Sequence, residues 1–515
     1  MFEMNRREGK LAGALALGLM ALMTGCRVGP AYHAPATPAV TAPNYKESTV
    51  NFKDQDGWKV ASPQDALLRG NWWEIFNEPE LNALEEQLNA NNQNIQVSYQ
   101  NYMAARAVIA QARSQYWPTV TFNPSWSRSR SSSNSGSNNN SGSSNSNSNN
   151  KGSTSSLWSL PIDVSWTPDF WGKIKNEVRE AQYSAQSSAA DLATEKLSMQ
   201  ASLAEYFFEI RGQDNLEQIL DATVKADQES LKSTQGAYDT GTGDEISVLE
   251  AKSTLDAAKA SLVNVGLLRA QYEHAIAVLV SKVPTDFSIP VKAVIYTPPP
   301  IPVGVPSQLA ERRPDIAQYE RKLAADNATI GIGYGAFFPD VTLSASGGLE
   351  SSLFKHLFDW PSRVWSIGPS VSETIFNGWQ YRAQLHQYEA QYNADVATYR
   401  QTVLTAFQQV EDELAGTRIY SQQILHEQDA VKSAQQSYEI EKERYNTGID
   451  PYVDVVTTQT TLLGDQVTLN SLQVEEMLSA VQLVQALGGG WDVSQLPTAA
   501  QAGAKVPNSD YKMQQ

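Results

Sequence analysis

The chain has 515 residues, a formal net charge of −17 at pH 7 and an isoelectric point near 4.8. This acidic balance argues against a nucleic-acid partner, because binding to phosphates needs a basic surface. After residue 25 no apolar run reaches the ~18 residues of a transmembrane helix, and with only one cysteine, Cys26, the chain forms no internal disulfide.

The first 25 residues have the pattern of a secretory signal peptide, with a basic start at residues 6–10 and an apolar run over residues 11–23. Small residues then precede Cys26, as in a bacterial lipobox, with methionine at the position that usually holds leucine. We expect cleavage before Cys26 and lipidation there, which helps to anchor a chain without making it span a membrane. The alternative is an incidental unpaired cysteine in a secreted chain. Arg27, rather than aspartate, follows Cys26, and under the sorting rule for such lipoproteins this indicates the outer membrane.

Residues 26–70 are predicted to form an extended arm, because prolines are spaced through their first part. An ordered region begins at Trp72 and Trp73. A helix is expected to start at residues 77–80, where Pro79 stands in the first turn, and to continue to about Ser114.

Short segments with period-two alternation follow this helix, and they predict strands with one apolar and one polar face. The first segment, residues 117–126, sets Val120, Phe122 and Trp126 against threonine, asparagine and serine. A tract of serine and asparagine at residues 131–156 cannot pack a core and is predicted to be a solvated loop. The alternation then resumes over residues 158–166.

Two very long helical runs without proline dominate the rest, at residues 172–238 and 379–445. At ~1.5 Å per residue each is roughly 100 Å long. Each run ends at a Tyr-x-Thr-Gly turn, with Gly241 in the first and Gly448 in the second. Returning helices are predicted at residues 246–281 and 453–487, and the second of these carries apolar residues at the spacing of a coiled-coil seam.

The second half of the chain repeats the first. Early positions match at an offset of 221, as in Pro118 and Pro339, and later ones at 207, as in Gly241 and Gly448. The predicted parts are a signal peptide, an arm, a first repeat, a proline-rich linker, a second repeat and a C-terminal tail predicted to lack structure: 1–25, 26–70, 71–282, 283–306, 307–490 and 491–515.

Four amphipathic strands per chain need a partner for their apolar faces. That partner is either a second sheet or lipid, and the signal peptide and lipobox favour lipid. A barrel in lipid must close, and the smallest such barrels have about eight strands. Two chains would give eight strands with a plugged lumen, whereas three would give twelve with a water-filled one. The polar inner set favours the channel. We therefore predict a mainly α-helical homotrimer with a twelve-stranded outer-membrane β-barrel and a long periplasmic α-helical barrel.

Several motifs occur along the chain: the lipobox with residues 27–32, Trp72-Trp73, residues 312–316, Phe337-Phe338-Pro339, residues 375–378 and the two Tyr-x-Thr-Gly turns. Together they resemble the lipoprotein (OprM/NodT) branch of the TolC-like outer-membrane efflux factors. The resemblance covers nearly the whole chain and implies an exit duct of a tripartite efflux or export system. It also implies docking to a periplasmic adaptor and, through it, to an inner-membrane pump of the resistance-nodulation-division type.

A channel works through selectivity and gating, and the narrowest point is expected where the hairpins end. Asp450 and Asp454 are one helical turn apart, and in a trimer each becomes a ring of three carboxylates that attracts cations. For Asp450 the alternative is a role as N-cap before Pro451. Asp454 lies inside the helix, where capping does not need it.

The resemblance implies a closed state held by aperture carboxylates and by a tyrosine-centred bond between hairpins. Tyr445 and Asp454 match those positions. The partner position on the first hairpin is Ser247, where some members carry aspartate, so Asp244, Glu245 and Arg444 are alternative partners.

We expect no enzymatic activity, cofactor or metal site, because the five histidines form no close pair and the acids lie on long helices at solvated spacing. A periplasm-spanning coiled-coil lipoprotein without a pore is the main alternative function, but it leaves the strands and the repeat unexplained. A soluble periplasmic enzyme explains neither the helices nor the lipobox. The sequence does not identify the cargo, because a passive duct passes whatever its pump supplies.

Overall fold

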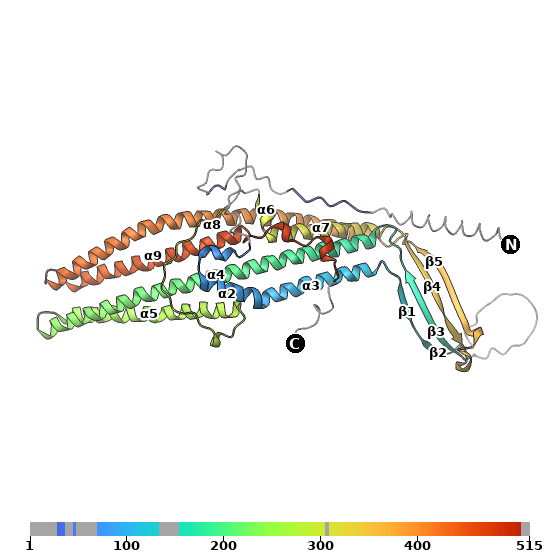
Figure 1. Ribbon diagram of the computed structural model, residues 1–515, viewed down its shortest axis with the longest axis horizontal. Coiled ribbons are helices and arrows are strands. Elements are labelled where there is room, and N and C mark those ends of the chain that lie inside the picture. The colour runs from blue at the N-terminus through green and yellow to red at the C-terminus, as the bar shows by residue number, and fades with distance from the viewer. Residues whose placement is uncertain (1–27, 37–44, 48–69, 133–153, 304–307, 506–515) are drawn as a thin grey trace, which may run out of the picture. The chain divides into compact units, whose positions relative to one another are not determined.

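The computed structural model describes residues 28–36, 45–47, 70–132, 154–303 and 308–505 (Figure 1). Cys26, the signal peptide and most of the serine and asparagine tract lie outside these residues. The chain forms two compact units. The first includes residues 106–183 and 323–394, and the second includes residues 184–322 and 395–505. Within the described ranges, no helix has both the length and the apolar character that crossing a membrane requires.

The first unit carries an antiparallel sheet of order β1-β3-β4-β5, in which β2 also pairs with β3. The predicted first strand is broken at residues 123–124, where Pro124 has no N–H to donate, so β1 and β2 share one position in the order. The chain therefore fills four positions in the sheet, as predicted. The strands are β1 Thr119–Phe122, β2 Ser125–Arg130, β3 Thr154–Trp166, β4 Asp340–Ser351 and β5 Arg363–Ser372.

One face of this sheet is apolar and exposed. The register sets Trp126 opposite Trp158, and their rings lie 5.6 Å apart. On the same face Ile162 is 51% exposed and Ile367 is 76% exposed. An apolar surface that stays open in one chain needs a partner outside that chain.

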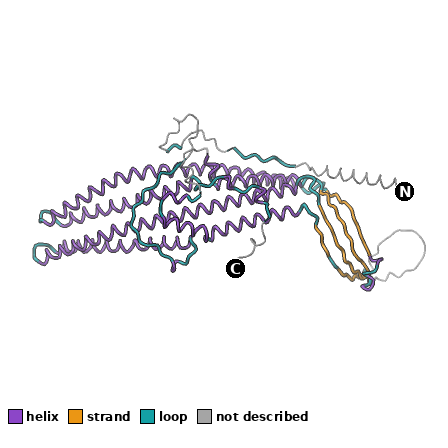
Figure 2. The backbone as a smooth tube through the Cα atoms, viewed as in Figure 1, coloured by secondary structure: helices purple, strands orange, loops and turns teal. Residues whose placement is uncertain are grey.

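Two helical hairpins of equal length form the two halves of the repeat (Figure 2). The outgoing helices α4 (Lys173–Asp239) and α8 (Gln380–Asn446) have 67 residues each. The returning helices α5 (Glu245–Leu279) and α9 (Tyr452–Ala486) have 35 residues each. All eight ends fall within two residues of the predicted positions.

The single helix predicted to end near Ser114 is in fact two helices, α2 (Pro79–Asn91) and α3 (Gln93–Ser114). Asn92 breaks the run, because its side chain donates to the Leu279 carbonyl at 2.8 Å and accepts from the Ile95 N–H at 3.0 Å. An asparagine that caps one helix while bonding to a distant one carries no local sequence signal. In the second half, α6 (Leu309–Arg312) and α7 (Pro314–Gly335) take the corresponding place.

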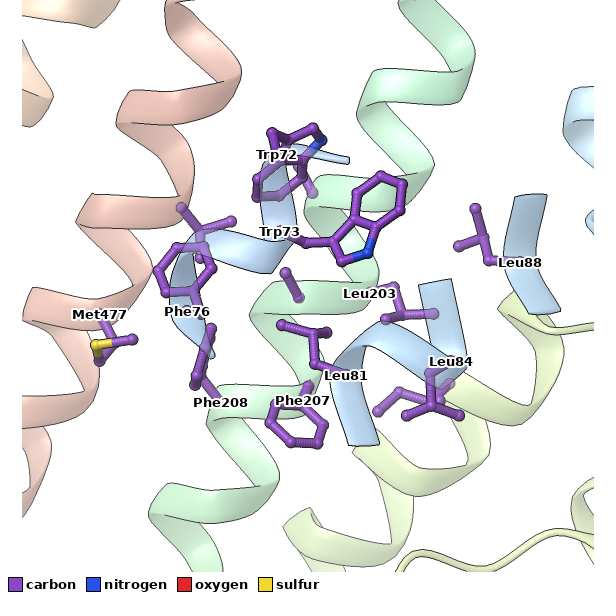
Figure 3. Close-up of a cluster of buried hydrophobic side chains, with 14 of the residues drawn as sticks. Trp72, Trp73, Phe76, Leu81, Leu84, Leu88, Leu203, Phe207, Phe208 and Met477 are labelled. Atoms are coloured by element: carbon purple, nitrogen blue, oxygen red, sulfur yellow. The ribbon is translucent and has the colours of Figure 1, made fainter. Parts of the chain in front are cut away.

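The main core of the second unit joins the short helix η3 (Trp72–Phe76) and α2 to α4 and α9 (Figure 3). Trp72 and Trp73 are 1% and 2% exposed, and Phe76 packs on Phe208 with ring centroids 5.2 Å apart. Burying one such side chain contributes roughly 1.5–3 kcal/mol. The motif Trp72-Trp73 thus fixes the segment before α2 to both hairpins.

Two arginine side chains hold the linker that follows α5 through hydrogen bonds to its carbonyl groups. Arg211 donates to the Pro290 carbonyl at 2.7 Å, and Arg269 donates to the Ile289 carbonyl at 2.7 Å. The Asp214 carboxylate joins both guanidinium groups, at 2.9 Å from Arg211 and 2.7 Å from Arg269. A linker with few backbone partners of its own is fixed in this way.

The tail is ordered further than predicted. It contains η8 (Val493–Gln495) and α10 (Ala499–Ala502), and the Pro497 carbonyl accepts a hydrogen bond from Gln186 at 2.8 Å. Thr498 and Gln501 form a capping box that stabilises α10. The expectation of a tail without structure is wrong for residues 491–505.

Candidate functional site

Each hairpin ends in the same turn, which explains the motif Tyr-x-Thr-Gly. In the first tip (residues 238–247), Gly241 has φ +76°, its N–H bonds to the Tyr238 carbonyl, and the Thr242 N–H bonds to the Ala237 carbonyl. This pair of bonds is a Schellman motif, which satisfies carbonyls that the helix end leaves free. The Thr240 hydroxyl donates to the Gly236 carbonyl at 2.9 Å and so covers one more.

The second tip (residues 445–454) repeats this geometry. Gly448 also has φ +76°, and its N–H bonds to the Tyr445 carbonyl at 2.9 Å. The Ile449 N–H bonds to the Arg444 carbonyl at 2.9 Å, and the Thr447 hydroxyl donates to the Glu443 carbonyl at 3.0 Å. Both tips are thus built by the same local rule.

The tips differ in how their acids are used. At the first tip Asp244 is the N-cap of α5 and accepts from the Ser247 N–H at 2.7 Å, which holds the pKa of Asp244 below its usual range. At the second tip the N-cap of α9 is Pro451, and Asp450 makes no cap bond. The alternative interpretation of Asp450 as an N-cap is therefore wrong.

Asp450 instead pairs with Arg444 across the second turn. Arg444 donates through both Nε and Nη2, and the Nη2 to Oδ1 distance is 3.0 Å. The guanidinium lowers the pKa of Asp450. Partial burial and the Asp450 carboxylate raise the pKa of nearby Glu441. The Asp450 carboxylate therefore binds a residue of its own hairpin.

Asp454 lies in the first turn of α9 and is exposed. Its carboxylate has no hydrogen-bond partner among the described residues. Glu245, in the first turn of α5, is exposed as well. These two acids face water in the single chain.

Tyr445 packs edge-on against Tyr452 with ring centroids 5.2 Å apart, and burial together with the charge of Asp244 raises the pKa of Tyr445. The charge of Asp244, on the first hairpin, contributes to this raised pKa of Tyr445 on the second, whereas the Ser247 N–H donates to Asp244. Ala251 of α5 joins Tyr452 and Val455 of α9 in one apolar cluster. The returning helices of the two hairpins therefore pack together just behind the tips.

Sequence reasoning missed a polar contact deeper between the hairpins. Asp227 of α4 is 1% exposed and accepts a hydrogen bond from the Gln459 amide of α9. Burial raises the pKa of Asp227, and among the described residues its second oxygen has no hydrogen-bond partner. Its charge raises the pKa of Tyr438 and of Tyr452, which places both phenols beside it. The sequence does carry one signal for this contact: Asp227 falls in the row of apolar positions of α4 that contains Val224 and Leu231.

No group of three or more histidine, cysteine or acidic side chains in the described part of the chain is arranged to hold a metal ion. The five histidines include His356 and His386, which pair with single carboxylates on their own turns at 2.7 and 3.3 Å.

Comparison with known proteins agrees with this geometry. The model of the outer membrane efflux protein family matches residues 84–281 and 305–489. The antibiotic efflux pump outer membrane protein ArpC of Pseudomonas putida is 28% identical over 488 residues, covering 94% of this chain and 97% of ArpC. The solvent efflux pump outer membrane protein SrpC of Pseudomonas putida is 28% identical over 483 residues, covering 94% of this chain and 99% of SrpC.

The fold is also that of solved outer-membrane channels. The Campylobacter jejuni CmeC channel superposes with a TM-score of 0.79 at 22% identity, over 91% of this chain and 96% of CmeC. The predicted fold class, mainly helical with a small β part and an internal repeat, is confirmed. The chain therefore belongs to the outer membrane efflux protein family and is the outer-membrane channel of an efflux system.

Proposed function

We propose that three copies of this chain form a passive exit duct, whose twelve strands close a barrel in the outer membrane and whose hairpins form a tube in the periplasm. The observation that carries this proposal is a sheet of only four positions with an open apolar face, on the same chain as two 67-residue helices. Lipid covers such a face only if the sheet closes, and four strands are too few to close alone. The duct has no enzymatic activity and no cofactor of its own.

The hairpin tips form the gate of this duct, and Asp454 of the second tip faces the axis. This assignment is supported by the exposed carboxylate of Asp454 in the first turn of α9, next to a turn that is fixed by Gly448 and by the pair Arg444–Asp450. Three such carboxylates around one axis repel each other and attract cations. Beside this aperture the two hairpins are coupled by charge, because Asp244 of the first contributes to the raised pKa of Tyr445 of the second.

Lipidation of Cys26 fixes the mature N-terminus to the membrane. The chain just after this residue is tightly seated in the first unit. Val28 accepts from Asn176 at 3.1 Å and donates to the Trp171 carbonyl at 3.2 Å, and a Cβ on Gly29 would lie 2.7 Å from Cα of Gly331. Because Val28 is held only two residues after Cys26, a lipid on Cys26 would lie close to the first unit.

The duct receives its cargo from a periplasmic adaptor and an inner-membrane pump of the resistance-nodulation-division type. This step rests on the family and on relatives whose names describe them as parts of efflux pumps. Those relatives are named for antibiotics in one case and solvents in the other. Cargo choice therefore belongs to the pump, and the duct passes what the pump supplies.

Purification from membranes followed by planar-bilayer recording tests the proposal. The full chain should need detergent for extraction, cross-link as a trimer and give a small, cation-preferring conductance. Replacement Asp454→Ala should raise that conductance, whereas Lys259→Ala on the exposed part of α5 should not. A monomer that is extracted without detergent would contradict the duct and favour the coiled-coil lipoprotein without a pore. An intact trimer with unchanged conductance in Asp454→Ala would contradict the gate alone.

A further inference from the structure

The charged residues of the sheet divide by face according to their sign. The register sets Asp163 opposite Ser346 and Glu350 opposite Ser159, so the acids of the strands lie on the polar face, as does Asp340. Arg128 pairs with Ser156, two residues along β3 from the Trp158 that faces Trp126. By the same alternation, the three basic residues of the strands lie on the apolar face: Arg128, Arg130 and Arg363.

These three arginines, here called the arginine rim, also share one end of the strands. Each strand position joins a helix at one end and a loop at the other (Figure 1). Arg130 is the last residue of β2 before the loop, and Arg363 is the first residue of β5 after a loop. The helix-proximal half of the apolar face contains no basic strand residue in the described sheet.

Aromatic side chains accompany the arginine rim. Trp126 contacts Trp158, which contacts Phe354 with ring centroids 5.0 Å apart. Arg363 stacks over the ring of Trp360. Tryptophan and phenylalanine gather where the apolar core of a membrane meets its headgroups, so this cluster marks the membrane surface on the loop side.

The three arginines can bind a ligand at the membrane surface on the loop side. All three are exposed. None forms an ion pair with a carboxylate in the described part of the chain. The nearest acids are engaged or turned away, because Asp359 pairs with His356 at 2.7 Å and Glu350 projects to the polar face. An arginine without an ion pair on a lipid-facing surface is stabilised when its side chain extends to the headgroups. There its guanidinium group binds a phosphate with two hydrogen bonds.

We propose that the arginine rim binds the phosphate groups of lipids in the outer leaflet around the channel. This inference rests on the proposed barrel, because it requires the apolar face to meet lipid. It assigns these phosphates to membrane lipid and not to free phosphate, because the arginines sit on the apolar face among aromatic side chains. Each basic residue at an anionic membrane surface adds about fivefold in affinity.

Binding of lipid A to the detergent-solubilised full chain, followed by native mass spectrometry, tests the proposal. The wild type should bind bisphosphorylated lipid A roughly tenfold or more tightly than dephosphorylated lipid A. The combined variant Arg128→Gln, Arg130→Gln and Arg363→Gln should lose this preference, and the same three positions changed to lysine should keep most of it. The matched control removes three exposed lysines of the helices: Lys225→Gln, Lys259→Gln and Lys432→Gln.

A glutamine variant that keeps the preference, or a control that loses it equally, overturns the arginine rim. Competition by millimolar inorganic phosphate would overturn the assignment to lipid. Bilayer conductance of the same preparations separates this inference from the proposed function, because the wild type and the glutamine variant should both conduct. Absent conductance with lipid binding intact contradicts the duct, and conductance without a phosphate preference contradicts the arginine rim.

Discussion

Arg444 decides where the Asp450 carboxylate points, because the pair closes over the second turn of the same hairpin. Replacement Arg444→Gln should release Asp450 and add three negative charges near the aperture of a trimer. We expect a stronger cation preference, measured as a shift of the reversal potential under a salt gradient, by a few millivolts to tens of millivolts. The double variant with Asp450→Asn should return to the wild-type value, and a shift that persists in it would contradict this role.

Asp227 is a second residue with a specific prediction, because its carboxylate is buried between the two hairpins against Gln459, Tyr438 and Tyr452. Burial raises its pKa, so the stability that the protonated form contributes is lost as the pH rises through that raised value. Asparagine keeps an acceptor for Gln459 without a charge. Asp227→Asn should therefore raise the melting temperature relative to wild type at pH 8 and raise it much less at pH 4, which is close to the ordinary aspartate pKa of 3.8. An equal change at both pH values would contradict the assignment.

At the scale of elements, the long hairpins were predictable because glycine and proline mark their ends while the helices between contain neither proline nor long loops. The turns at Gly241 and Gly448 could be predicted from the sequence alone, because glycine readily adopts the positive φ that both positions have. The break at Asn92 could not, since it depends on the carbonyl of Leu279 on another helix. The partner of Asp450 was equally hidden, because a flexible arginine can reach several carboxylates and only packing selects one. Asp227 stayed unnoticed because acids on long helices are usually solvated.

The turn glycines give a prediction with an internal control. Alanine at Gly448 or Gly241 would have to adopt a φ of +76°, which costs roughly 1–2 kcal/mol. Alanine at Gly464 of α9 or Gly236 of α4 meets no atom within 4 Å and should stabilise its helix by up to about 1 kcal/mol. Thermal unfolding of the four variants should separate them into two pairs. Equal effects would mean that the turns tolerate other conformations.

At the scale of the whole molecule, the repeat supplies two hairpins that share a backbone but differ in charge. The offset of 207 residues that relates Gly241 to Gly448 also relates Ser247 to Asp454. Three chains would thus bring six similar tips to one end of a tube, with acids at only three of the equivalent positions. Similar backbones allow regular packing around the tube, while the charges make alternate hairpins distinct.

This difference predicts which tips approach the axis. Apart from Cys26 the chain has no cysteine, so a single introduced thiol can be addressed alone. With a short bismaleimide, Asp454→Cys should cross-link subunits of the trimer in membranes and reduce the bilayer conductance, because its copies meet around the aperture. Ser247→Cys, at the equivalent position of the first tip, should cross-link much less, and the wild type gives the background from Cys26. If the two variants cross-linked equally, the hairpins would contribute alike to the aperture, and the assignment of the gate to the second tip would be wrong.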